Sequence, residues 1–156
     1  MLNIVLVNPE IPQNAGNILR TAIATEAVVH FIRPFSFSLD QAHLRRACLD
    51  YYPKRQVVIW ESVEDFLKEN GEKELFLFTK KAKKIYTDTD YRDKKEIFLV
   101  FGKESSGLDP SLLLKYPDRL LRIPTSSSVR SLNLSNAVAI SVYEVLRQKG
   151  FDKEWL

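Results

Sequence analysis

The sequence has one cysteine (Cys48), two histidines (His30 and His43) and five glycines among its 156 residues. A single cysteine excludes an internal disulfide and is typical of a reducing compartment, so we expect a cytoplasmic protein. So few cysteines and histidines do not supply the ligands of a zinc or iron site, and we expect no metal. The longest apolar runs are well short of the ~20 residues that cross a membrane, so we expect no membrane association. The opening MLNIVLVNPE lacks a basic leader and a small-residue cleavage site, and it predicts a first strand instead of a signal peptide.

The composition is that of a globular protein, with 45% hydrophobic and 28% charged residues. The length predicts a single domain over residues 1–156 that buries a substantial core. The net charge of only +3 says little about nucleic acid, but the charges are unevenly distributed. Basic residues cluster at 80–84, 45–46 and 54–55, whereas acidic residues concentrate at 61–74.

Six short apolar runs alternate with segments of helical spacing along the chain. The runs predict strands at 2–7, 28–34, 56–60, 74–79, 96–102 and 120–123. Residues 8–16 contain two prolines and predict a loop, and helices are expected at 17–27, 39–49, 62–71, 110–116 and from about 137 to 149. Ser38 with Gln41, Ser62, and Asp109 followed by Pro110 are the expected helix starts. This alternation predicts an α/β fold whose six-stranded parallel sheet has helices on both faces.

Polar loops follow three of the predicted strands, and ligands of parallel sheets bind at such strand ends. Thr79 ends the fourth strand, GKESSG (102–107) follows the fifth, and a Ser- and Asn-rich turn leads from the sixth into RSLNLSNA (130–137). GxGxxG is missing, which disfavours a dinucleotide site, and GKESSG lacks the Lys-Ser or Lys-Thr of a phosphate loop. The three loops predict a site for a flat, adenine-sized molecule held mostly through backbone groups.

Three segments resemble the ordered motifs of the SPOUT methyltransferases. They are NAGNILR (14–20), LVFGKESSGL (99–108) and IPTSSSVRSLNLSNAVAISVYE (123–144), each at or after a predicted strand. The opening residues, LRRACLDY (44–51) and the short length are similar to the branch that methylates the ribose 2′-hydroxyl of the pyrimidine at tRNA position 34. The resemblance implies S-adenosylmethionine as methyl donor, S-adenosylhomocysteine as product, and a trefoil knot in the C-terminal part of the fold. It also implies a homodimer acting on the tRNA anticodon stem-loop.

Site residues are implied by their positions in these motifs. The expected cofactor site comprises Phe78, Thr79, Gly102, Glu104, Gly107, Ile123, Ser131 and Leu132. The expected catalytic set is Arg20, Asn14, Glu104, Ser131 and Asn133. Because a guanidinium stays protonated in proteins, we interpret Arg20 as a clamp on the hydroxyl and the adjacent phosphate, not as a free base. Glu104 is a candidate arginine partner or proton acceptor.

The RNA-binding surface is predicted from charge. Lys80, Lys81, Lys83 and Lys84, together with Arg45 and Arg46, are candidate phosphate contacts. The almost uniformly apolar last helix favours burial by a second subunit. Two alternatives remain at this point: a methyltransferase of this family with another target, such as ribosomal RNA or a base nitrogen, and a non-catalytic nucleotide- or RNA-binding module.

Overall fold

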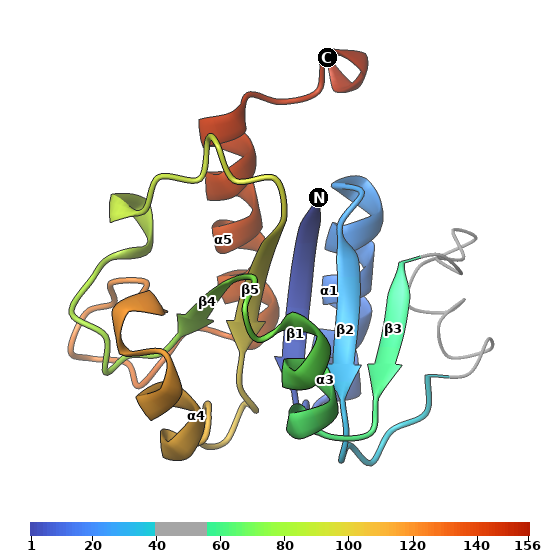
Figure 1. The fold of residues 1–156 in the computed structure, drawn as a ribbon, viewed down its shortest axis with the longest axis vertical. Helices are drawn as coiled ribbons and strands as arrows, with labels where there is room; N and C mark the ends of the chain where they lie inside the picture. Colours follow the sequence, from blue (N-terminus) through green and yellow to red (C-terminus); the bar gives the residue numbers. More distant parts are fainter. Residues whose placement is uncertain (40–55) are drawn as a thin grey trace.

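A computed structural model describes residues 1–39 and 56–156. Its core is a six-stranded sheet with the strand order β3-β2-β1-β5-β4-β6 (Figure 1). Every neighbouring pair in this sheet is parallel, as predicted from the alternation of strands and helices. The strands are β1 (Leu2–Val7), β2 (Val28–Ile32), β3 (Val57–Trp60), β4 (Glu74–Phe78), β5 (Ile97–Phe101) and β6 (Leu120–Leu121).

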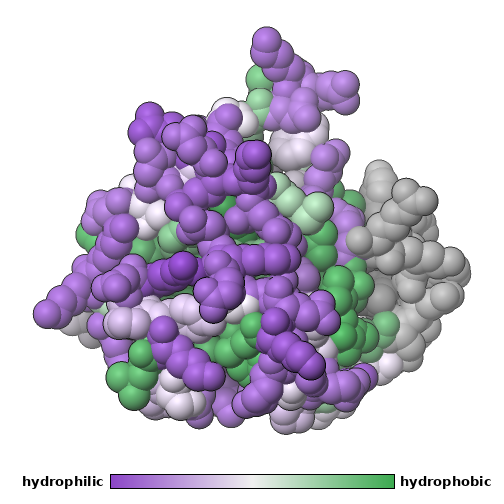
Figure 2. Space-filling view, in the orientation of Figure 1, coloured by the Kyte–Doolittle hydropathy of each residue, from purple (hydrophilic) through white to green (hydrophobic). Residues whose placement is uncertain are grey.

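Two hydrophobic cores lie on opposite faces of the sheet because successive strand side chains point to opposite sides. In β1, Ile4 and Leu6 pack into one core, and Val5 and Val7 pack into the other. The first core is closed by α1 (Pro12–Ala24) and α5 (Leu134–Lys149), and the second by α3 (Val63–Asn70) and α4 (Pro110–Lys115). Helices therefore cover both faces, which confirms the predicted fold class. Seen from the side of α3 and α4, the surface is largely hydrophilic with small scattered apolar areas (Figure 2).

Several helix boundaries follow the expected caps. The Ser62 hydroxyl accepts a hydrogen bond from the Asp65 amide at 3.0 Å at the start of α3. Asp109 caps α4 with Pro110 in its first turn, and α5 ends at Lys149 before Gly150. Gly150 has φ +76°, a left-handed conformation that suits glycine after a helix.

Other boundaries were predicted wrongly. Helix α1 begins at Pro12 and ends at Ala24, whereas the sequence predicted a loop up to residue 16 and a helix over 17–27. β2 ends two residues early, at Ile32, and β6 has only two residues in place of the four expected. β6 is short because it lies at the sheet edge and pairs with β4 alone. The helix expected at 39–49, with His43, Cys48, Arg45 and Arg46, lies outside the described residues except for Leu39, and the 44–51 motif lies wholly outside them.

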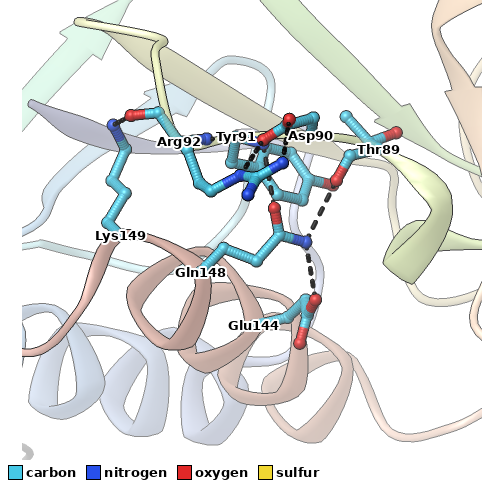
Figure 3. Close-up of polar contacts among 7 residues, drawn as sticks. All are labelled: Thr89, Asp90, Tyr91, Arg92, Glu144, Gln148 and Lys149. Carbon is cyan, nitrogen blue, oxygen red and sulfur yellow. Dashed lines mark hydrogen bonds and ion pairs between the residues drawn. The ribbon is translucent and has the colours of Figure 1, made fainter.

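The side chains of Gln148 and Lys149 on α5 bind the backbone of the long connection between β4 and β5 (Figure 3). The Gln148 Oε1 atom accepts from the Tyr91 amide at 2.9 Å, and its Nε2 atom donates to the Thr89 carbonyl at 3.0 Å. The same Nε2 donates to Glu144, whose carboxylate also pairs with Arg147 at 2.8 Å. These bonds fix the connection that carries the lysine cluster against α5. The trefoil knot stays a prediction.

No helix within residues 1–39 and 56–156 is long and apolar enough to cross a membrane.

Candidate active site

A cavity of about 440 Å³ lies where β4, β5 and β6 end. Pockets for small molecules typically measure about 300–1,000 Å³ and favour the carboxyl ends of parallel strands. Residues at and after the end of each of these three strands line the cavity. All eight residues expected to hold the cofactor are among them: Phe78, Thr79, Gly102, Glu104, Gly107, Ile123, Ser131 and Leu132.

The loop after β5 folds tightly back on itself at Gly102. A Cβ atom at Gly102 would lie 2.1 Å from the Gly107 carbonyl carbon and 2.2 Å from the Leu108 nitrogen. The Gly107 amide donates to the Lys103 carbonyl at 2.9 Å, and Gly107 itself has φ +72°. Only glycine allows this close approach at position 102, where the backbone of Gly102 itself lines the cavity.

Aromatic and aliphatic side chains supply the apolar surfaces of the cavity. The rings of Phe78 and Phe101 stack with their centroids 4.6 Å apart and their planes at 16°. Leu108 and Leu132 also line the cavity. A pocket with stacked rings, aliphatic surfaces and backbone donors suits a planar heterocycle.

One chain of hydrogen bonds links the three motifs beside this cavity. The Glu104 Oε1 atom accepts from Asn14 Nδ2 at 3.2 Å, and Asn14 Oδ1 accepts from Asn133 Nδ2 at 2.9 Å. Asn133 Oδ1 in turn accepts from the Ser135 amide at 2.9 Å and caps α5. Four of the five residues expected to be catalytic line the cavity: Asn14, Glu104, Ser131 and Asn133.

Glu104 also binds the backbone at the start of α1. Its two oxygens accept from the Glu10 amide at 2.8 Å and from the Ile11 amide at 3.0 Å. The Glu10 carboxylate accepts from the Ser105 hydroxyl at 2.6 Å, and the Arg130 guanidinium donates to the Ser105 carbonyl at 3.0 Å.

Sequence reasoning missed Glu10, Ser105 and Arg130 as parts of the site. Arg130 opens the RSLNLSNA stretch, and its place there was the one available signal. No sequence pattern indicated that Glu10 pairs with a residue 95 positions away.

Arg20 lies apart from this group within one chain. It is exposed on α1, on the same stripe as the exposed Gln13 and Asn17, and it does not line the cavity. Of the four lysines expected to bind RNA, Lys80 and Lys81 line the cavity, whereas Lys83 and Lys84 are exposed outside its lining. Among the described residues, no group of three or more His, Cys, Asp and Glu side chains is arranged to hold a metal ion.

The model of the SpoU rRNA methylase family matches residues 1–143. A protein of Geobacillus stearothermophilus is 48% identical over 151 residues, 96% of each chain. A tRNA (cytidine(34)-2′-O)-methyltransferase of Polaromonas sp. is 41% identical over 155 residues, 97% of this chain and 93% of its own.

Two solved structures are similar over nearly all of this chain. One, described as "Structural insights into the 2-OH methylation of C/U34 on tRNA", has a TM-score of 0.85 at 40% identity and covers 95% of both chains. The other is an AdoMet-bound rRNA methyltransferase from Sinorhizobium meliloti, with a TM-score of 0.82 at 26% identity. It covers 94% of this chain and 56% of its own.

Proposed function

This chain belongs to the SpoU methylase family, and we propose that it transfers a methyl group from S-adenosylmethionine to the ribose 2′-hydroxyl of the pyrimidine at tRNA position 34. The observation that carries this function is the cavity at the ends of β4, β5 and β6, which residues of all three motifs line. Relatives that match nearly the whole chain act on cytidine 34, which favours this target over ribosomal RNA or a base nitrogen.

The residues around the cavity fit S-adenosylmethionine. Gly102 and Gly107 have no side chains of their own, so the backbone groups at the two ends of this loop are available to the polar edge of an adenine. Ile123, Leu132 and Leu108 line the cavity with apolar side chains that would contact the adenine faces, and Ser131 and Thr79 offer hydroxyls. The bound donor supplies a methyl group on a sulfonium, an electrophile that needs no metal ion.

The chain itself must prepare the nucleophile. A ribose hydroxyl is a weak nucleophile at neutral pH, so the site has to orient it and stabilise the charge that develops on its oxygen. Arg20 performs this task by binding the hydroxyl oxygen and the adjacent phosphate through its guanidinium. Asn14, Ser131 and Asn133 position the ribose and the donor.

Because Arg20 lies outside the cavity of its own chain, the proposal includes a homodimer in which each Arg20 serves the cavity of the other subunit. Apolar side chains on and after α5 support this arrangement. Ile140 is 37% exposed and Tyr143 is 49% exposed, and the Tyr143 ring lies 6.3 Å from that of Phe151. An apolar surface of this kind on a helix favours burial against a second subunit.

The anticodon stem-loop is the proposed docking partner. Lys80 and Lys81 line the cavity, and Lys83 and Lys84 follow in the same positively charged segment. This segment would attract and bind phosphates of the tRNA beside the cavity. Arg45 and Arg46 stay candidate phosphate contacts from their charge, and they lie outside the described residues. A tRNA substrate and a single cysteine both favour the cytoplasm.

The test is to incubate the purified protein with methyl-labelled S-adenosylmethionine and individual tRNAs, and then to map the label by nucleoside analysis. We expect 2′-O-methylated cytidine or uridine at position 34 and no label at other positions. Label in a base or in ribosomal RNA alone would replace the proposed target, and absence of label from all RNA would leave a binding module.

A further inference from the structure

We propose that Glu104 is a positioning residue which caps helix α1 from the opposite loop and thereby places Arg20 for the reaction. This inference deepens the proposed function and rests on it. It assigns to Glu104 a role different from the proton acceptor that the motif alone suggests.

Helix α1 has no cap of its own. Its N-cap residue is Ile11, in extended conformation (φ −105°, ψ 113°), and Ile11 offers no side-chain oxygen. The first turn contains no acidic residue that could complement the helix dipole. The first amides of a helix have no partner within the helix, and a carboxylate beside them is stabilising. Glu104 supplies that carboxylate by accepting from the amide of Ile11, the N-cap residue, and from the amide of Glu10, which precedes it.

The segment before α1 and the loop after β5 are joined by hydrogen bonds from side chains of both. Glu104 binds the backbone of Glu10, while the Glu10 carboxylate binds the backbone amide and the hydroxyl of Ser105 at 3.3 Å and 2.6 Å. Arg130 adds a bond to the Ser105 carbonyl from the third motif. The start of α1 therefore cannot shift without moving the loop that forms one wall of the cavity.

The same carboxylate determines the direction of the hydrogen bonds beyond it. An ionised carboxylate only accepts, so Asn14 must turn its Nδ2 toward Glu104 and its Oδ1 toward Asn133. Asn133 must then use its Oδ1 to cap α5. One carboxylate thus orders the starts of both helices that pack together behind the site.

Three N–H groups of its own chain converge on the two oxygens of Glu104, and two of them belong to the backbone at the start of α1, so the carboxylate acts through this helix. Arg20 lies nine residues beyond Ile11 on the same helix, so a loosened first turn misplaces the guanidinium. Misplacement by about 1 Å can cost on the order of a hundredfold in rate.

The experiment separates capping from proton transfer by giving α1 a cap of its own. Glu104→Gln retains the size of the side chain but replaces one acceptor oxygen with a donor, and we expect kcat to fall about tenfold to a hundredfold. The KM for S-adenosylmethionine should change less than kcat, and the pH profile of kcat should keep its shape. Ile11→Ser places a hydroxyl at the N-cap, where it can accept from the amide of Gln13 or Asn14 and hold the first turn by other bonds. Glu104→Gln should therefore lower kcat less in an Ile11→Ser background than in the wild type. Glu72→Gln, on the exposed turn after α3, is the matched control.

Amide hydrogen exchange at Glu10 and Ile11 gives a readout that does not depend on activity. We expect slow exchange in the wild type and exchange at least about tenfold faster in Glu104→Gln. The inference would be overturned if Glu104→Gln left amide exchange at Glu10 and Ile11 unchanged, or if it left kcat unchanged. It would also be overturned if Glu104→Gln lowered kcat equally with and without Ile11→Ser and flattened the pH profile of kcat. If the wild type methylated no tRNA, the proposed function would fail, while the exchange measurement would still decide whether Glu104 caps α1.

Discussion

The buried histidine of β2 should make this protein sensitive to acid. His30 is only 7% exposed, and its Nδ1 atom accepts from the Trp60 Nε1 atom at 3.0 Å. The ring proton must therefore lie on Nε2, which faces Asn3 Oδ1 at 3.1 Å. The rings of Trp60, Phe66 and Phe98 surround the imidazole at centroid distances of 6.1, 5.9 and 5.6 Å. This site accommodates the neutral imidazole, and protonation would leave a charge facing the Trp60 N–H donor.

The loss of folding stability at low pH can be calculated from the pKa of His30. Burial first, and the positive charge of Lys73 second, lower the pKa of His30 from 6.5 to about 4, with Glu96 acting in the opposite direction. Below pH 6.5 the unfolded chain binds a proton at His30 that the folded chain does not bind until about pH 4. The stabilisation is therefore complete above the unfolded pKa and is lost as the pH falls toward the folded one. A difference of this size corresponds to about 3 kcal/mol, a large part of a typical folding free energy of about 5–15 kcal/mol.

Urea unfolding at about pH 7 and about pH 4.5, compared between the wild type and His30→Gln, tests this reasoning. Trp60 contacts His30 and reports unfolding by fluorescence, and a Trp155→Phe background removes the signal of the other tryptophan. Other carboxylates titrate in both proteins, so the comparison isolates the histidine. Between about pH 7 and about pH 4.5, we expect the free energy of unfolding of the wild type to fall by about 2–3 kcal/mol more than that of His30→Gln. An equal fall in the free energy of unfolding of the two proteins would show that His30 does not cause the acid sensitivity.

Three further predictions concern the site. Arg20→Ala should abolish methyl transfer and leave the affinity for S-adenosylhomocysteine, measured by calorimetry, near that of the wild type; a greatly weakened affinity would instead place Arg20 in the donor pocket. Gly102→Ala forces a Cβ to 2.1 Å from the Gly107 backbone, so donor affinity should collapse, and retained affinity in the same titration would contradict the described loop. Replacing Lys80, Lys81, Lys83 and Lys84 with Gln should make the plot of log tRNA affinity against log salt concentration less steep, by about 1 for each phosphate that the protein no longer binds. An unchanged slope would exclude these lysines as phosphate ligands.

The fold was predictable because its main signal is local. Each strand is a short apolar run, and β1 is buried along its whole length. Caps such as Ser62 and Asp109 lie beside the helices that they start, so the boundaries of α3 and α4 could be read from neighbouring residues. The two-residue β6 was overestimated because an apolar run does not reveal how much of it finds a partner strand.

The walls of the cavity were also predictable, whereas the hydrogen bonds between them were not. Resemblance to a family indicated Gly102, Ser131 and the other residues that line the cavity, and all eight of them do line it. The bonds of Glu10 to Ser105 and of Arg130 to Ser105 join loops 95 and 25 residues apart, and no spacing rule covers such pairs. Side-chain identity alone could not show that Glu104 faces backbone amides.

The wrong start of α1 and the arrangement of the site have one physical origin. No residue next to this helix caps it, and the carboxylate at its start is that of Glu104, 94 residues from Glu10 and three residues beyond the end of β5. The pairing of Leu6 with Phe101 brings both strands to the same edge of the sheet, so Glu10 and Glu104 meet only when β1 and β5 are side by side. Formation of the first turn of α1 therefore depends on that strand pairing, and so does the placement of Arg20. The site geometry is a product of the assembled sheet, which explains why residues 12–16 were predicted as a loop although they form the start of α1.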